Sequence, residues 1–106
     1  MERLDGDEDF LRELLAIFHQ DAPANLACCR GALAAGEFPG LTRAAHRLKG
    51  MLKNLAMGAA AETAADLETT ARKELIEESK QHLEQLAGEL ESLFPEVEAR
   101  LAEVRS

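Results

Sequence analysis

The chain has 106 residues and a formal net charge of −8, and 46% of its residues are hydrophobic but only 4% aromatic. This length supports one hydrophobic core, so we expect a single domain over residues 1–106, and the abundance of Leu and Ala favours helices. The negative charge argues against nucleic acid or an anionic membrane surface as a partner, because both are bound mainly through Lys and Arg. No apolar run approaches the roughly 20 residues of a membrane span.

The first part of the chain carries signals for two helices. An acidic stretch at residues 5–9 suits a helix N-terminus, where carboxylates interact favourably with the helix dipole. Apolar residues then recur at helical spacing up to Phe18, and this helix is expected to end near residues 19–21. Pro23 fits the first turn of a second helix, which Gly36 closes.

The remainder predicts three further helices. The third spans about residues 39–54 and the fourth residues 59–72, with Gly58 marking the break between them. A fifth begins near residue 73 or 74 and reaches about residue 104, and Pro95 either kinks it or starts a new segment. Helices joined by such short connections favour an all-α, antiparallel bundle.

The two cysteines, Cys28 and Cys29, are adjacent. Neighbouring residues of a helix point about 100° apart, which makes a disulfide between them implausible. We expect both to be reduced thiols that pack as small hydrophobic residues. The N-terminal residues also lack the basic and apolar segments of a signal peptide, so we expect a cytoplasmic location.

Residues 38–61 contain four basic residues, one histidine and no Asp or Glu, in a chain with 20 acidic residues. At about 100° per residue, four residues fall on the helix face opposite the core leucines. These are His46, Lys49, Gly50 and Lys53, flanked by Arg43 and Arg47. An accessible histidine in a basic, acid-free helix predicts a site that handles an anion.

The residue types on this face suit reversible phosphorylation. An imidazole has an ordinary pKa of about 6.5, so one ring nitrogen is nucleophilic near neutral pH. Lys49, one turn beyond His46, supplies positive charge to phosphoryl oxygens. Gly50 lowers the stability of the helix by about 1 kcal/mol relative to Ala, and the close approach of another protein explains a glycine at this position.

At these residues the chain resembles histidine-containing phosphotransfer (Hpt) domains of two-component phosphorelays. The signature is Ala-His-Arg-Leu-Lys-Gly at residues 45–50, followed by Asn54-Leu55 and then by Leu67-Glu68 on the next helix. The resemblance implies an up-down four-helix bundle with an additional N-terminal capping helix. It also implies a phosphocarrier without an ATP site or autonomous catalysis, rather than an enzyme.

The resemblance further implies roles for individual residues. His46 is the phospho-acceptor, through Nε2, Lys49 screens the phosphoryl charge and Gly50 clears the docking space. Glu68 hydrogen-bonds the imidazole, and the basic flank (Arg43, Arg47 and Lys53) binds the partner. The partners are response-regulator receiver domains and an upstream hybrid histidine kinase. No cofactor is expected on this chain, since the Mg²⁺ belongs to the receiver.

Two positions depart from the family pattern. Many members have Gly where this chain has Ala56, with Gly58 following two positions later, so the turn between the helices is expected to differ. Lys53 stands where a small residue is common, and it either strengthens the phosphate site or restricts which receiver docks. His19 and His82 match no functional position and are expected to be surface or packing residues.

Several alternatives stay open from the sequence. The chain also fits the phosphorylated domain of a chemotaxis-type kinase, or a helical adaptor that has lost relay chemistry. A metal site formed by the three histidines and the cysteines is disfavoured, because their spacings are not those of metal ligands. A free-standing relay protein and a domain of a larger hybrid sensor kinase are equally compatible with the sequence.

Overall fold

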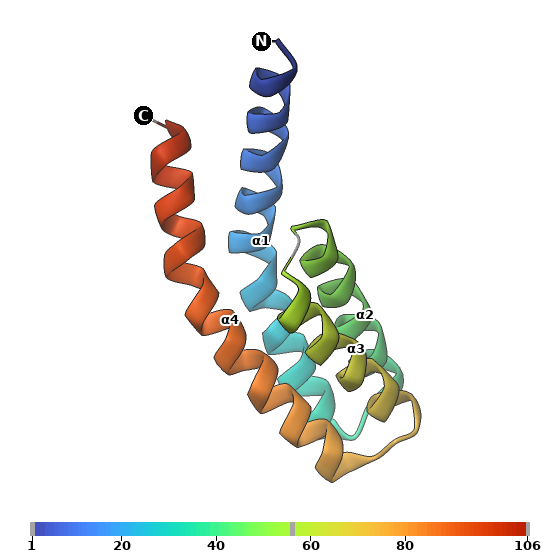
Figure 1. Cartoon of the computed structure of the whole chain (residues 1–106). Coiled ribbons are helices and arrows are strands. Elements are labelled where there is room, and N and C mark those ends of the chain that lie inside the picture. The colour runs from blue at the N-terminus through green and yellow to red at the C-terminus, as the bar shows by residue number, and fades with distance from the viewer. Residues whose placement is uncertain (1, 56, 106) are drawn as a thin grey trace.

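The structure is a computed structural model that describes residues 2–55 and 57–105, with the side chains of residues 10, 12–55, 57–99 and 102. The described residues form four helices, α1 (Glu2–Ala35), α2 (Phe38–Asn54), α3 (Gly58–Arg72) and α4 (Ile76–Arg105). The helices alternate in direction, and each packs against its neighbours in the cycle α1, α2, α3, α4 (Figure 1). The prediction of an all-helical, antiparallel bundle is therefore confirmed.

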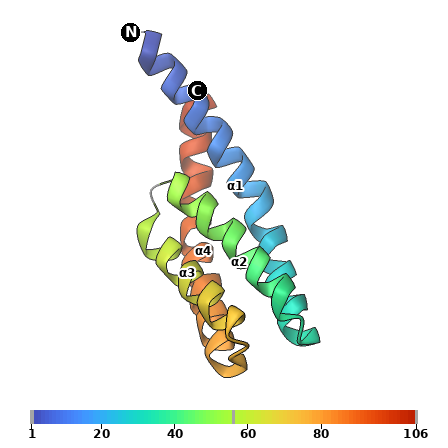
Figure 2. The same ribbon diagram turned by 90° about the vertical axis from the view of Figure 1, so that its right-hand side faces the viewer.

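The helices differ in length, and this gives the molecule an elongated shape of 49 × 21 × 19 Å. The N-terminal part of α1 and the C-terminal part of α4 continue beyond α2 and α3, as both views show (Figures 1 and 2). The four-helix part of the bundle is thus confined to the length of α2 and α3. No helix in the described part of the chain combines the length and apolar character needed to cross a membrane.

The predicted helix break at Pro23 is wrong, because α1 continues through this proline for 34 residues. The described residues therefore contain no separate N-terminal capping helix. Buried side chains continue on one face across Pro23, namely Leu15, Phe18, Ala22, Leu26 and Cys29. Interior proline costs a helix about 3 kcal/mol, whereas burial of each large apolar side chain contributes about 1.5–3 kcal/mol. Packing against the bundle outweighs the local preference of proline.

Pro95 is accommodated in the same way within α4. The buried residues Leu90 and Val97 lie on either side of it, while Pro95 itself is exposed. The helix therefore continues through Pro95, and no new segment begins there.

The end of α1 has the hydrogen bonding of a Schellman motif. The Glu37 amide donates to the Ala32 carbonyl at 2.8 Å and the Gly36 amide to the Leu33 carbonyl at 3.1 Å. Gly36 has φ +72°, a left-handed conformation that glycine adopts without the steric cost of a side chain. Gly36 therefore closes the helix as predicted. Helix α2 begins at Phe38, so the connection between α1 and α2 is very short.

The end of α3 repeats this motif without a glycine. The Leu75 amide donates to the Thr70 carbonyl at 2.9 Å and the Glu74 amide to the Ala71 carbonyl at 3.0 Å. Glu74 holds the left-handed position with φ 58°. The boundary between the fourth and fifth predicted helices is real, but no glycine or proline marks it in the sequence. The last helix starts at Ile76, slightly later than predicted.

Replacing Glu74 with Gly should stabilise the fold. Glycine at this position removes a left-handed strain of about 1–2 kcal/mol, partly offset by its greater freedom in the unfolded chain, so we expect a net gain of about 1 kcal/mol. Chemical denaturation measures this change. Gln81→Gly, at an exposed interior position of α4, is the matched control and should lose about 1 kcal/mol. A loss of stability in Glu74→Gly would contradict the assignment of Glu74 as the helix-closing residue.

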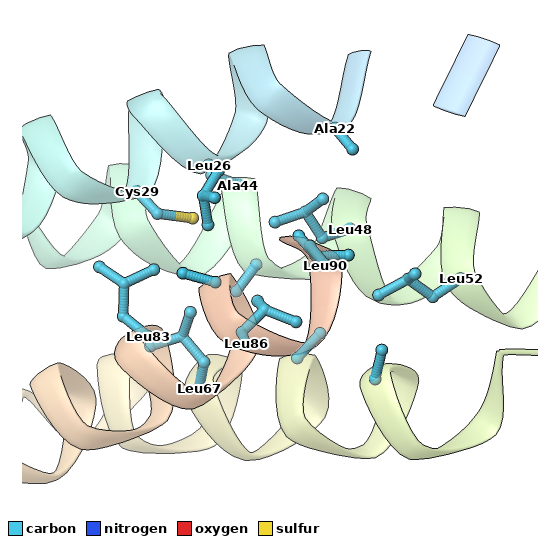
Figure 3. Packing of buried hydrophobic residues seen from close by; sticks show 14 of the residues in the cluster. Ala22, Leu26, Cys29, Ala44, Leu48, Leu52, Leu67, Leu83, Leu86 and Leu90 are labelled. Atoms are coloured by element: carbon cyan, nitrogen blue, oxygen red, sulfur yellow. The ribbon is translucent and has the colours of Figure 1, made fainter. Parts of the chain in front are cut away.

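The core fills the space between all four helices. Figure 3 shows Leu26 and Cys29 of α1 facing Leu48 of α2 and Leu86 of α4. Leu41, Leu48, Leu52, Leu67, Leu86 and Leu90 are fully buried, and alanines of α2 and α3 allow these helices to approach closely. Two further cross-helix contacts are polar, since Ser79 of α4 donates to Thr70 and Gln85 donates to Thr63, both on α3.

The two cysteines differ in environment, although both are free thiols. Cys29 is buried in the core, and burial raises the pKa of its thiol to about 11. Cys28 is exposed, so the prediction that both pack as hydrophobic residues is wrong for Cys28. Adjacent helical residues diverge in direction, and only one of them can face the core.

Candidate functional site

Helix α2 separates an apolar face from a basic face. Its buried residues are Leu41, Ala44, Ala45, Leu48 and Leu52, which all belong to the core. The opposite face carries His46, whose side chain is 65% exposed. This exposure agrees with the helical-wheel prediction and leaves the imidazole accessible on the surface of the bundle.

His46 contacts Glu68 on the neighbouring helix α3. Its Nδ1 lies 3.0 Å from Glu68 Oε2, whereas the described residues offer Nε2 no hydrogen-bond partner. The side chain of Glu68 is only 8% exposed, so its carboxylate is nearly buried between α2 and α3. The contact holds the ring by one nitrogen and directs the other away from Glu68.

Two cations also contact the same carboxylate. Lys49 Nζ lies 2.7 Å from Glu68 Oε1, and Arg72 Nη2 donates to Oε2 at 2.8 Å. Lys49 comes from α2, one turn after His46, and Arg72 comes from α3, one turn after Glu68. A buried carboxylate at the centre of three basic side chains therefore links the two helices.

The environment of Glu68 decides its protonation state. Burial raises the pKa of this carboxyl, but hydrogen bonds and charge from Lys49 and His46 oppose the effect and place the pKa below the ordinary value of 4.5. Glu68 is therefore ionised at neutral pH and can only accept hydrogen bonds. It follows that His46 donates through Nδ1, so the lone pair of a neutral ring is on Nε2.

The surface next to His46 is open. A Cβ atom added to Gly50 would meet no atom within 4 Å, so packing within the domain does not require a glycine there. The basic flank of Arg43, Arg47 and Lys53 is exposed around this surface. No acidic side chain of α2 interrupts it, because residues 38–54 contain none.

Comparison with known protein families matches residues 13–105 to the Hpt domain. The chain belongs to the Hpt domain family. Neither a curated protein nor a solved structure shows significant similarity to it. The family resemblance predicted from residues 45–50 is thereby confirmed over nearly the whole chain.

Membership in the Hpt family has direct functional consequences. Hpt domains take part in histidine-containing phosphotransfer in two-component signalling, and they are phosphocarriers rather than catalysts. Their partners are the receiver domains and kinases of a phosphorelay. This Hpt domain therefore belongs to a signalling relay.

The structure brings together His46, Lys49 and Glu68, but it leaves the basic flank outside their network. The network also contains Arg72, which was not predicted from the sequence. A signal for Arg72 was available, since it follows Glu68 by four residues, the spacing at which opposite charges on a helix meet. Pairs of opposite charge at that spacing are common on exposed helices. The Glu68–Arg72 pair differs from them only because Glu68 is buried.

The other two histidines lie in different surroundings. His19 Nε2 is 3.2 Å from Glu98 Oε2, and the His19 ring lies edge-on to Phe94, with 6.5 Å between ring centroids. His82 is half-buried on α4. Within the described residues, no group of three His, Cys, Asp or Glu side chains is placed to hold a metal ion.

The expected variation at Ala56 falls outside the described residues. Gly58 is the first residue of α3, one residue earlier than the sequence predicts. Its neighbour Met57 donates its amide to the Leu52 carbonyl at 2.9 Å, which ties the start of α3 to the end of α2.

Proposed function

We propose that His46 accepts a phosphoryl group at Nε2 from the aspartyl phosphate of a receiver domain, or from a histidine kinase, and donates it to the Asp of another receiver. The observation that carries this proposal is the contact between His46 Nδ1 and the ionised Glu68 on an otherwise exposed ring. This contact selects the tautomer in which Nε2 is the nucleophile.

The proposed step needs no proton transfer. The lone pair of Nε2 forms a bond to phosphorus while the bond from phosphorus to the aspartate oxygen breaks, and the receiver keeps the carboxylate. The Nδ1 proton stays on the ring, which becomes positively charged and remains hydrogen-bonded to Glu68. The negative charge of Glu68 stabilises this cation across 3.0 Å. In reverse, the same arrangement releases the phosphoryl group to a second receiver.

Several further roles belong to the same proposal. Lys49 balances the charge of the phosphoryl oxygens, and Arg43, Arg47 and Lys53 contact the acidic surface of the receiver, which brings the Mg²⁺. Opposite charges on the two surfaces accelerate docking. The chain works as one Hpt domain over residues 1–106, without a cofactor of its own, in the cytoplasm. It serves either as a free-standing relay protein or within a larger kinase.

Phosphoryl uptake from a phosphorylated receiver domain tests the proposed function. We expect an acid-labile, alkali-stable label on the chain, as for a phosphoramidate, and mass spectrometry of its peptides should place it on His46. His19 and His82 are internal controls, because neither has a Lys-Gly pair in the following turn. Absence of label from several receivers, or label on another residue, would contradict the proposal and favour a helical adaptor.

Gly50→Leu should separate stability from transfer. Leucine raises the stability of an exposed helix by about 1 kcal/mol relative to glycine, yet its side chain occupies the space in which the receiver docks. We therefore expect a more stable domain with phosphoryl transfer reduced about tenfold or more, since a 1 Å misplacement costs up to about 100-fold. The measurements are chemical denaturation and the rate of uptake from a receiver.

Gly88→Leu provides the matched control for this variant. Gly88 is exposed on α4, and a Cβ there also meets no atom within 4 Å. Gly88→Leu should raise the stability by a similar amount, and its rate of phosphoryl transfer should equal that of the native chain. Native transfer in Gly50→Leu would contradict the docking role of Gly50.

A further inference from the structure

The carboxylate of Glu68 has more cationic partners than the proposed phosphotransfer chemistry uses. Lys49 Nζ occupies Oε1 at 2.7 Å, whereas His46 Nδ1 and Arg72 Nη2 share Oε2 at 3.0 and 2.8 Å. Glu68 is nearly buried, while the side chain of Arg72 is 66% exposed and that of Lys49 23%. Two cations therefore compensate one buried anion.

Phosphorylation changes the balance of charge at this site. A phosphoryl group on His46 Nε2 places up to two negative charges beside Lys49, which lies one helical turn away on the same face. Lys49 Nζ lies 2.7 Å from Glu68 Oε1 in the unphosphorylated domain, so a move towards the phosphoryl oxygens draws its ammonium away from this carboxylate. When Lys49 leaves, Oε1 of the nearly buried carboxylate loses its cation, and only the groups at Oε2 still compensate the charge. Reduced compensation of a buried charge is unfavourable.

Arg72 is placed to prevent this loss. Its guanidinium contacts Oε2 and is always charged, so Glu68 retains this cation, beside the phosphorylated ring of His46, after Lys49 moves. Arg72 reaches Glu68 from the last turn of α3, where a positive charge also interacts favourably with the helix dipole. Arg72 Nη2 and His46 Nδ1 contact the same carboxylate oxygen, the first from α3 and the second from α2.

We propose that Arg72 is a positioning residue that keeps Glu68 charge-compensated and in place, so that Lys49 can transfer from Glu68 Oε1 to the phosphoryl group on His46. This inference rests on the proposed function of His46 as the phospho-acceptor. Lys49 then contacts Glu68 first and the phosphoryl group afterwards. The contribution of Lys49 to the rate of phosphotransfer therefore depends on Arg72.

The test uses phosphoramidate as the phosphoryl donor, so that no receiver has to dock. The Nε2 lone pair of His46 attacks phosphorus, the P–N bond of phosphoramidate breaks and ammonia leaves. The rate of phosphohistidine formation is followed by ³¹P NMR. Arg72→Gln should slow it about fivefold, because Lys49 then stays on Glu68. Lys73→Gln removes a neighbouring exposed charge at the same helix end and should change the rate less than about twofold.

A double-variant cycle distinguishes positioning from a general structural effect. We expect Lys49→Gln to slow phosphorylation about tenfold in the native chain but only about twofold in Arg72→Gln. Arg72→Lys should restore most of the native rate, because an ammonium also compensates Glu68. Two results would overturn the inference. One is that Lys49→Gln slows phosphorylation by the same factor in the native chain and in Arg72→Gln. The other is that Arg72→Gln and Lys73→Gln are phosphorylated at the same rate.

Failure of this inference is distinguishable from failure of the proposed function. If the native chain forms phosphohistidine at His46 and the cycle shows no coupling, the function stands and only the role of Arg72 is wrong. If neither phosphoramidate nor a phosphorylated receiver modifies His46, the proposed function and the inference are both wrong.

Discussion

His46→Gln is expected to abolish phosphoryl uptake while preserving the helical bundle. The glutamine amide has no nucleophilic nitrogen, so no phosphoramidate can form at this position. Its NH₂ group can still donate to Glu68, and the replaced side chain is largely exposed, so the free energy of unfolding should change by less than about 1 kcal/mol. Uptake from a phosphorylated receiver, circular dichroism and chemical denaturation measure these effects.

His19→Gln is the matched control for this variant. It removes an exposed histidine that also contacts a glutamate, here Glu98 on α4, and it should keep the native rate of uptake. Two results would contradict our interpretation of His46. Label that persists in His46→Gln would place the phospho-acceptor elsewhere, and an unfolded His46→Gln protein would contradict the surface position of the ring.

The part of the site that lies on one helix was predictable from the sequence. His46, Lys49 and Gly50 occupy α2, and the period of the helix alone places them on the face opposite the buried leucines. Contacts between helices follow from packing, which periodicity does not specify. Glu68 was therefore expected only through the family resemblance, and Arg72 was not expected at all.

The main error in the predicted fold arises at Pro23. The local preference of proline favours a helix start, but the apolar face of α1 continues across it, and packing in the bundle stabilises an uninterrupted helix. The end of α3 near residue 72 was predicted correctly, but Glu74, which holds the left-handed position, carries no strong local signal for it.

Glu68→Gln should lower both the stability and the phosphotransfer activity of the domain. The amide removes the charge that compensates Lys49 and Arg72, and it can present its NH₂ group to cations that need an acceptor. Breaking a fully buried ion pair costs about 3–5 kcal/mol, but both cations are partly exposed, so we expect a loss of about 2 kcal/mol at pH 7. Chemical denaturation measures it.

The stability difference between the native chain and Glu68→Gln should depend on pH. The pKa of Glu68 lies below its ordinary value, so the unfolded chain binds a proton at this group more readily than the folded one. The contribution of Glu68 is complete above the ordinary pKa of 4.5 and is lost as the pH falls through the lower folded value. The two proteins should therefore differ most at neutral pH, and their difference should shrink as the pH falls below this ordinary value.

Glu62→Gln controls for the removal of one negative charge from α3. Glu62 is exposed on the same helix, and its replacement should change stability by less than about 0.5 kcal/mol. A difference between native and Glu68→Gln that does not shrink as the pH is lowered through the acid range would contradict the assignment of Glu68 as an ionised, charge-compensated group.

The loss of activity in Glu68→Gln should exceed what the loss of stability explains. Without an ionised acceptor, Nδ1 of His46 no longer has to carry the proton, and the positive charge that develops on the ring during transfer loses its counterion. We expect transfer to slow about 10- to 100-fold in protein that is still folded, since removing one electrostatic partner of a transition state costs this order of magnitude. Nitrogen-15 NMR of His46 should show a larger share of the tautomer protonated at Nε2. A native tautomer with native transfer would leave Glu68 only a structural role, and would remove the reason for a buried carboxylate beneath this histidine.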